Sequence, residues 1–217
     1  MVGRPAVTAR IRPAGASDLA AIVAIKQSLA FSPGGARPRG GFLLGCAPER
    51  YLALIAADCV LVLGQGKRVA GFAVAVPDPL LRASDLWARR SLIRWSEGEG
   101  EPPPGEPIAY FDQLALAPWA SRLAAAPLAL AAARRLAESG HARLYATTLQ
   151  APIRNPAALP LLRGFGARIV GRVTEHYDEV GEVVSDLHCA PLSTDLEAVR
   201  AAPLGLRIST RAAALAA

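Results

Sequence analysis

The stretch FDQLALAPWASRLAAAPLALAAARRL, residues 111–136, decides the fold. Its apolar first part is typical of a strand, and an alanine-rich helix follows it after a short loop. A loop of this kind is a common phosphate site, because several backbone N–H groups point the same way at a helix N-terminus. Such loops usually contain glycine, which permits the close approach of a ligand, and this loop contains none. The remaining sequence must show whether a phosphate-bearing molecule binds here.

Length and composition are those of a globular protein with one main core. The chain has 217 residues, of which 52% are hydrophobic and 19% are charged. Its apolar runs fall short of the roughly 20 residues that a membrane helix needs, and the opening MVGRPAVTARIRP lacks the apolar centre of a secretory signal. We therefore expect a cytoplasmic protein without a membrane partner.

The net charge of +6 does not by itself indicate a nucleic-acid partner. Nearly all the basic residues are arginines, with only Lys26 and Lys67 as lysines, and they are scattered along the chain. Aromatic residues do not alternate with them, as a base-stacking surface would require. We expect no nucleic acid among the partners.

The cysteines and histidines show no metal-ligand spacing. They are few and far apart: Cys46, Cys59, Cys189, His141, His176 and His188. The cysteines are odd in number and widely separated, so neither a disulfide framework nor a zinc knuckle is indicated. We expect no metal, and we expect the thiols to be buried and reduced.

The first half of the chain predicts one strand, two helices and a hairpin. Residues 8–14 alternate like a strand, and residues 17–30 have the spacing of an amphipathic helix. After a Gly/Pro-rich loop at 31–45, residues 48–58 predict a second helix. Residues 59–78 place two β-rich runs around GQGKR, which predicts an antiparallel hairpin.

The second half alternates strands and helices after a polar, proline-rich excursion at 79–107. Within the excursion, residues 84–95 are predicted to form a helix. The elements after it are a strand at 108–118, a helix ending at Gly140, a strand at 142–150, a helix at 155–166 and two strands around DEVGE. A hairpin followed by strand, helix and strand predicts a mixed sheet with helices on its faces.

This order of elements resembles the GNAT superfamily of acyl-CoA-dependent N-acyltransferases over residues 8–190. IRPAGASDLAAI is similar to the opening strand and helix of the family, and GKRVAGFAVAV is similar to its central hairpin. FDQLALAPWASRLAAAPLALAAARRL resembles the strand, loop and helix that bind the cofactor pyrophosphate, and PIRNPAALPLLRGFGARIVGRV resembles the next helix and strand. The order and spacing of these motifs carry the resemblance.

The resemblance implies an α/β (α+β) fold, with a mixed, mostly antiparallel sheet of six to seven strands flanked by helices. The fourth and fifth strands of this fold splay apart into a V that holds the cofactor. The resemblance also implies that residues 1–190 form a single GNAT-like domain and that 191–217 form a tail. A capping box at Thr194–Glu197 predicts a short helix in that tail.

The cofactor loop departs from the family pattern Q/R-x-x-G-x-G/A, which falls on residues 122–127. Ala125 replaces the first glycine and adds a Cβ where a phosphate comes closest, and Pro127 replaces the second and removes one N–H. The amides from Leu123 to Ala126 are expected to remain available. The resemblance implies acyl-CoA contacts from Leu114, Ala115, Leu116, Arg122, Leu123, Ala124, Ala125, Ala126 and Asn155.

In the reaction that the resemblance implies, an amine attacks a thioester carbonyl that a backbone N–H at Leu114 or Leu116 polarises. Asp112 is the expected base, and Gln113 beside it cannot accept a proton at neutral pH. His176 is the alternative base. Asp112 could equally be a structural carboxylate that is paired with an arginine.

One position leaves the activity open. Leu162 stands where many members of the family carry a tyrosine as general acid for the leaving thiolate, and leucine has no proton to donate. We expect an N-acyltransferase that moves an acetyl or larger acyl group from acyl-CoA to a primary amine. The alternatives are an inactive GNAT-like binding or regulatory module, and a GNAT-like protein that uses an acyl carrier protein or decarboxylates a thioester.

The acceptor site is expected in the excursion. Trp87 and Arg90 lie there, and together with Tyr110 on the following strand they are the expected contacts of a small-molecule or peptide amine. A solvated helix that its tryptophans anchor would explain the same residues. The protein partner that we expect is a second copy, in a homodimer.

Overall fold

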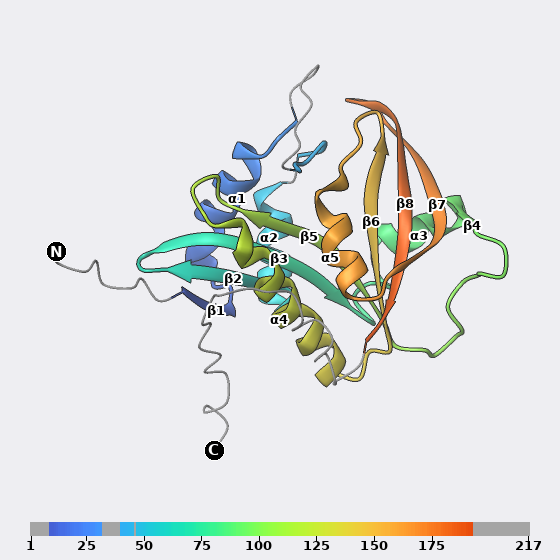
Figure 1. Ribbon diagram of the computed structural model, residues 1–217, viewed down its shortest axis with the longest axis horizontal. Coiled ribbons are helices and arrows are strands. Elements are labelled where there is room, and N and C mark those ends of the chain that lie inside the picture. The colour runs from blue at the N-terminus through green and yellow to red at the C-terminus, as the bar shows by residue number, and fades with distance from the viewer. Residues whose placement is uncertain (1–8, 32–39, 46, 193–217) are drawn as a thin grey trace.

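One mixed sheet of eight strands organises the chain (Figure 1). The computed structural model describes residues 9–31, 40–45 and 47–192. Across the sheet the strands lie in the order β1 (Ala9–Pro13), β2 (Val60–Gln65), β3 (Arg68–Pro77), β5 (Ile108–Leu116), β6 (Arg143–Ala151), β8 (Gly181–Pro191), β7 (Arg168–Tyr177) and β4 (Ile93–Trp95). Neighbouring strands are antiparallel except β5 and β6, which are parallel. The predicted mixed sheet is confirmed, with one strand more than the six to seven expected.

The additional strand, β4, lies where the sequence predicts a helix at 84–95. An α-helix forms only over Asp85–Ala88 (α3), and the 3-10 turn η2 (Arg89–Leu92) follows it. The next three residues pair with β7 instead, and glycine permits the close approach of the strands: a Cβ at Gly171 would lie 2.9 Å from the Arg94 carbonyl oxygen. The helix prediction is wrong at 93–95, because pairing with a distant strand outweighs the local pattern.

Helices cover both faces of the sheet. They are α1 (Leu19–Ser28), α2 (Pro48–Ala56), α4 (Ala125–Glu138) and α5 (Leu159–Gly164). Ile22 of α1 and Tyr51 of α2 pack on one face, and Leu128 and Leu136 of α4 pack on the other. Residues next to α5, including the buried Phe165, join the α4 side. The alanine-rich face of α4 lets this helix lie close to the strands.

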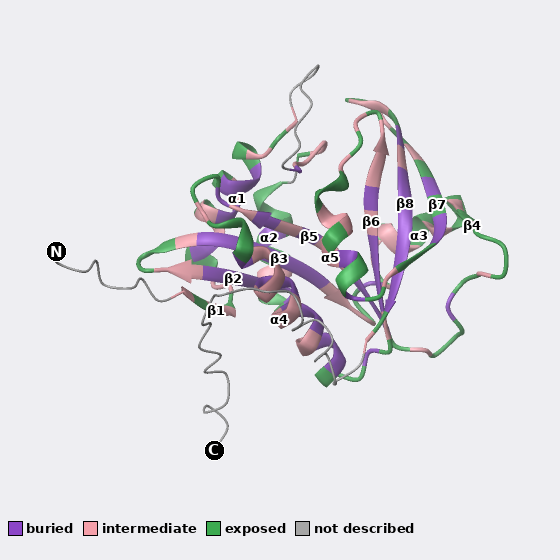
Figure 2. Cartoon of the chain, viewed as in Figure 1, coloured by how far each residue is buried: buried purple, intermediate pink, exposed green. Residues whose placement is uncertain are grey.

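The central strands have a helix layer on each side and are therefore apolar on both faces. In β2, Val60 and Val62 contribute to the core under α1 and α2, whereas Leu61 and Leu63 contribute to the core under α4. Figure 2 shows burial along the middle of the strands and along the inner side of the helices. The hairpin predicted at 59–78 is confirmed as β2 and β3.

The excursion between β3 and β5 forms a third core of its own. Its residues Leu81, Trp87 and Trp95 pack with Ile108 of β5 and Leu187 of β8. The excursion therefore covers part of the sheet that α1 and α2 do not reach, and Figure 1 shows α3 and β4 beside β7 and β8, at the opposite end of the sheet from β1.

Some predictions fall on residues outside those described. They are the helix in the 191–217 tail with its Thr194–Glu197 capping box, and residues 32–39 of the Gly/Pro-rich loop. Among the helices of the described residues, none has the length and apolar character needed to cross a membrane.

Candidate active site

β5 and β6 separate partway along their length. The two parallel strands pair from Ile108 with Arg143 to Phe111 with Ala146, and beyond these residues no pairing joins them. β5 nevertheless continues to Leu116, and β6 continues on the other side of the gap (Figure 1). The predicted V between these strands is confirmed. We call the point where the pairing ends the apex of the V.

A hydrogen bond between side chains closes the apex. The Tyr110 hydroxyl of β5 lies 2.7 Å from the Thr147 hydroxyl of β6, one residue beyond the last paired residue of β6. Tyr110 is buried, and burial strongly raises the pKa of its phenol, with the nearby charges of Asp112 and Glu175 adding to the effect. Tyr110 is therefore a neutral hydrogen-bonding group at physiological pH.

Asp112 is the extra residue of a β-bulge at the apex. Opposite β3, Gln113 pairs with Val74 and Phe111 pairs with Ala75, so Asp112 has no partner residue. The bulge shifts the alternation of side chains along β5. Phe111 contacts the core under α4, whereas Gln113 points to the other face and reaches α2.

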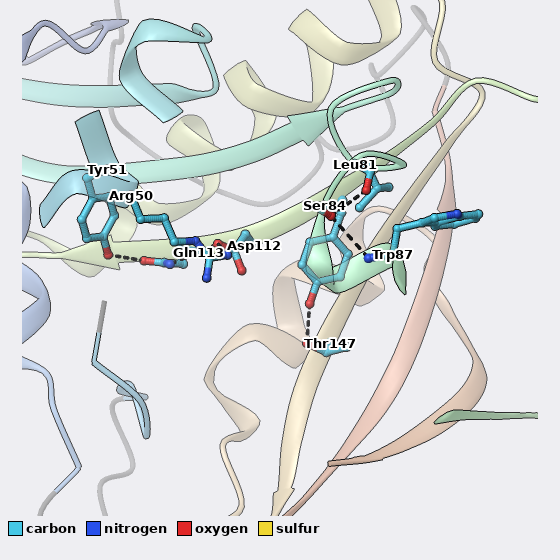
Figure 3. A network of polar contacts seen from close by, with 9 residues as sticks. Arg50, Tyr51, Leu81, Ser84, Trp87, Asp112, Gln113 and Thr147 are labelled. Atoms are coloured by element: carbon cyan, nitrogen blue, oxygen red, sulfur yellow. Dashed lines mark hydrogen bonds and ion pairs between the residues drawn. The ribbon is translucent and has the colours of Figure 1, made fainter. Parts of the chain in front are cut away.

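A chain of polar contacts connects α2 with the bulge (Figure 3). The Tyr51 hydroxyl donates a hydrogen bond to Gln113 Oε1 at 2.6 Å, and Gln113 Nε2 donates to Asp112 Oδ2 at 3.1 Å. Arg50 Nη2 lies 3.7 Å from the same Asp112 oxygen. The Asp112 side chain is 19% exposed, so it is held in place while part of it stays accessible. This arrangement orients the Asp112 carboxylate through Gln113 and Arg50, and the role of Asp112 as a base stays a prediction.

The backbone amides of β5 supply donors to the V. Ala117 N–H donates to the Ala70 carbonyl oxygen of β3 at 2.8 Å. Because N–H directions alternate along a strand, the amides of Leu116 and Leu114 point away from β3 and into the V, whereas the amide of Ala115 points toward β3. Two of the three strand residues expected to contact acyl-CoA thus present an N–H to the gap.

The loop before α4 offers fewer free amides than the sequence indicates. It forms a 3-10 turn, η3 (Arg122–Ala124), and Ser121 Oγ accepts from Leu123 N–H at 3.4 Å. Ala124 N–H donates to the Ser121 carbonyl at 3.0 Å, and Ala125 N–H donates to the Arg122 carbonyl. The expectation that the amides from residue 123 to 126 are available is therefore wrong for three of them. The turn satisfies these donors internally in place of a phosphate.

The contacts of Asn155 and Leu162 are those of residues that hold the fold together. Asn155 Oδ1 accepts from Ala157 N–H at 3.3 Å, and its Nδ2 donates to the Gly41 carbonyl oxygen at 3.2 Å. Asn155 thus holds the segment after α1 against the segment after β6, and its contact with acyl-CoA stays a prediction. Leu162 is buried in α5 with 9% of its surface exposed.

A pocket lies beside the apex, on the face of the sheet that carries α1 and α2. The excursion forms its outer wall with Trp87, Arg90 and Trp95, and the strands form its floor. Tyr110 and Thr147 belong to that floor, so the pocket reaches the end of the β5–β6 pairing. The three residues predicted for acceptor binding, Trp87, Arg90 and Tyr110, are brought together here.

His176 lies apart from this group. It is exposed on β7, whereas its neighbour Glu175 lines the pocket, because side chains alternate along a strand. Sequence reasoning missed Glu175, Thr147 and Tyr51. The alternation of Val173, Glu175 and Tyr177 is a signal for the first of these, but the other two become visible only once the strands and α2 are placed.

Metal binding finds no support among the described residues. No group of three His, Cys, Asp or Glu side chains there has a metal-binding arrangement. Cys59 and Cys189 are buried, and burial raises the pKa of both thiols. The expected absence of a metal and the expected homodimer stay predictions.

The fold is shared with solved acetyltransferases. A chain of the NatC complex bound to Gag peptide and CoA matches with a TM-score of 0.57 at 14% identity, covering 86% of this chain and 99% of that one. Arabidopsis thaliana NAA60 in complex with acetyl-CoA gives 0.58 at 17% identity, covering 85% and 99%. An N-acetyltransferase from Staphylococcus aureus gives 0.54 at 16% identity, covering 86% and 99%.

No protein-family model and no curated protein matches the sequence. At these identities the structural likeness concerns the fold, and the chain has the fold of the GNAT acetyltransferases.

Proposed function

We propose that the protein transfers an acetyl or larger acyl group from acyl-CoA to the primary amine of a small molecule or peptide. The observation that carries this proposal is the V itself: an oriented carboxylate and a lined pocket lie beside its apex, and two backbone amides follow along β5 inside it. Solved proteins of the same fold contain CoA with a Gag peptide, or acetyl-CoA. These complexes support acyl-CoA as the donor and an amine as the acceptor.

The reaction needs few side chains. The amine nitrogen attacks the thioester carbonyl carbon, a C–N bond forms, and the C–S bond breaks. In the V, the N–H of Leu114 or Leu116 stabilises negative charge on the carbonyl oxygen. Asp112 accepts the proton that the amine loses, directly or through a water, and that proton then passes to the departing sulfur.

The absence of a general acid at Leu162 is compatible with this chemistry. A thiol has a pKa of about 8.5, so a thiolate is a good leaving group near neutral pH without prior protonation. By contrast, a protonated amine with a pKa of about 10.4 cannot attack at all. The chemistry therefore requires a base more than an acid, and the site contains a carboxylate at the apex.

The loop before α4, where the CoA phosphates are expected, matches the proposal less well than the apex does. Arg122 is exposed and free to approach a phosphate, but the amides of Leu123, Ala124 and Ala125 already have acceptors within the loop, and Pro127 has no N–H. We therefore expect weak binding of CoA. This loop also favours a second candidate: a donor that lacks the adenosine diphosphate part of CoA, such as an acyl carrier protein, would not need the loop.

The test combines transfer and binding. Purified protein is incubated with acetyl-CoA and a panel of primary amines, and both thiol release and acylated product are measured. Calorimetry with CoA alone is run in parallel. Acylated amine together with saturable CoA binding supports the proposal. CoA binding without product supports a binding module, and product formed only from an acylated carrier protein supports the second candidate.

A further inference from the structure

We propose that the pocket beside the apex holds the body of the acceptor, and that this acceptor is a primary amine on a bulky, preferably aromatic, group with an oxygen at its far end. This inference rests on the proposed function, because it specifies the substrate class of the same site. It comes from the construction of the excursion at 79–107, from the lining of the pocket and from one buried donor in its wall.

The excursion is fastened to the rest of the protein at several points. Arg82 Nε lies 2.8 Å from Asp78 Oδ2, and Arg82 Nη2 donates to the Glu106 carbonyl oxygen at 3.0 Å. These contacts tie the start of the excursion to its end. Asp78 N–H donates to His141 Nε2 at 3.1 Å, and β4 pairs with β7. The outer wall of the pocket is therefore fixed before any ligand arrives, which reduces the entropy cost of binding.

The interior of the pocket is apolar. Trp87, Trp95, Ile108, Tyr145 and Leu187 line it. Burial raises the pKa of Tyr145 to about 12, so its ring carries a neutral hydroxyl at physiological pH. An apolar or aromatic ligand body would lose water from its own surface and from these side chains on entering.

The charged residues of the pocket are paired with one another. Arg89 Nε lies 3.1 Å from Glu175 Oε1, and Arg90 Nε lies 3.5 Å from Glu101 Oε2. The Arg90 guanidinium also lies over the Trp87 ring, 5.0 Å from its centroid. Two opposite pairs leave no net charge in the wall, so the pocket does not select a ligand with a strongly charged body.

One donor in this wall distinguishes a hydrocarbon chain from a ligand with an oxygen. Arg90 Nε is buried and makes no hydrogen bond, although Glu101 lies within ion-pair distance. A fatty acyl chain has no acceptor to offer this N–H and would leave it without a hydrogen bond, which is unfavourable. A phenol, carbonyl or ether oxygen would satisfy it. The occupant with the better chemical match is therefore an acceptor with an oxygen.

The orientation of the ligand follows from the two ends of the pocket. Tyr110 and Thr147 mark the inner end, next to Asp112 and the V. Arg90 belongs to η2 in the outer wall. In Figure 3, Thr147 and Trp87 lie on the side of Asp112 that is away from Tyr51. The reactive amine thus belongs at the inner end, and the oxygen belongs at Arg90.

The first experiment measures binding of the acceptor without any donor. Tyramine and phenethylamine differ only in the distal hydroxyl, and both are titrated into the full chain by calorimetry. We expect tyramine to bind about tenfold more tightly, because a hydrogen bond to a charged group favours it. Arg90→Met keeps the apolar stem and removes the donor, so it should bring tyramine to the affinity of phenethylamine. Equal affinities in the unmodified protein, or no binding of either amine, would overturn the inference.

A second pair of variants tests the position. Leu86 lines the pocket and is half-buried, so Leu86→Trp should fill the space and weaken both amines at least tenfold. Leu92→Trp makes the same substitution at an exposed neighbour and should leave both affinities unchanged. Melting curves of both variants verify folding, and a Leu86→Trp protein that unfolds is replaced by Ile93→Phe in the same wall. Equal effects of the two tryptophan variants contradict the pocket.

Further titrations separate the sources of the ligand and the two proposals. Peptides that begin with tyrosine or phenylalanine show whether the oxygen is read on a peptide N-terminus or on a free amine. Decanoyl-CoA that binds more tightly than acetyl-CoA, and loses this advantage in Leu86→Trp, would assign the pocket to an acyl chain and overturn the inference. Binding of tyramine without acyl transfer would refute the proposed function alone, and transfer to small amines without tyramine binding would refute this inference alone.

Discussion

The two ends of one strand–loop–helix unit differ in the polar groups that they offer to a ligand. At the apex of the V, β5 provides a bulged carboxylate with two polar neighbours, a buried tyrosine bonded across to β6, and a pocket with a fixed wall. At the loop before α4, the same unit has alanine and proline where the family pattern has glycines, and its amides bond to the loop itself. The end proposed for the acceptor thus has several polar groups held in place, whereas the end proposed for the phosphates has few free donors.

This difference indicates where specificity resides. A loop whose amides already have partners gains little when a phosphate replaces them, because one hydrogen bond is exchanged for another. A preformed pocket with an unsatisfied donor gains more from the right ligand. The protein should therefore distinguish acceptors more sharply than it holds CoA.

The largest expected effect comes from Asp112→Asn. Asparagine keeps the shape and cannot accept a proton, so kcat for acyl transfer should fall by about 10²–10⁴-fold. Steady-state rates across pH check this, and the decline in rate toward acid pH should disappear in the variant. Glu49→Gln removes an exposed carboxylate of α2 and serves as the control. Full turnover in Asp112→Asn would make this carboxylate structural, as its contact with Arg50 would then imply.

The next effect is expected from Pro127→Ala, which restores an N–H near the start of α4. A charge-assisted hydrogen bond to a phosphate should tighten CoA binding about tenfold, measured by calorimetry. Pro104→Ala, at an exposed position of the excursion, should leave the affinity unchanged. An unchanged Kd in Pro127→Ala would mean that the phosphates do not lie on this loop.

A smaller gain is expected from Ala125→Gly. It removes the Cβ that crowds the loop but adds no donor, and glycine near a helix start weakens the helix slightly. The Kd for CoA should fall by less than it does in Pro127→Ala, while the affinity for amines stays the same. A larger gain than from Pro127→Ala would make steric crowding, and not the lost donor, the main defect of the loop.

The smallest effect on ligand binding is expected from Asp18→Asn. Asp18 precedes α1, away from both the apex and the loop before α4, so its replacement should change stability only. Hydrogen bonds from Arg12 and from Gly15 N–H hold the pKa of Asp18 below its ordinary value. The stability from this group is present above the unfolded pKa of about 3.9 and is lost as pH falls through the lower folded pKa. Urea unfolding should show a loss of about 1–3 kcal/mol at pH 7. The difference from the unmodified protein should vanish in acid, and both CoA and amine affinities should remain.

Much of the sheet could be predicted from local patterns. The hairpin of β2 and β3 follows from two β-rich runs around GQGKR, and the V follows from the resemblance of 111–136. β4 could not be predicted, because Ile93 and Trp95 form a strand only against β7, whose paired residues lie 76 to 80 positions further along the chain. Pairing at that distance leaves no local signal.

The candidate site was predictable in its residues more than in its geometry. Asp112, Trp87, Arg90 and Tyr110 stand out by type and position in the sequence. That Asp112 occupies a bulge depends on its register with β3, which the sequence does not display. The hydrogen bonds within the loop depend on Ser121, and nothing in the sequence distinguishes this serine from any other polar loop residue.

The bulge in β5 also makes the length of this strand a constraint. Gln113 and Ala115 face α1 and α2, whereas Phe111 before the bulge contacts the core under α4. A deletion of residue 112 itself would remove the bulge, keep Gln113 and Ala115 on their present face and take the carboxylate away from the apex. A deletion of residue 114, by contrast, would turn Ala115 toward α4 and Leu116 toward α1 and α2, and the backbone amides that point into the V would change with them. Related chains should therefore tolerate exchanges of side chains along β5 far better than gaps after the bulge.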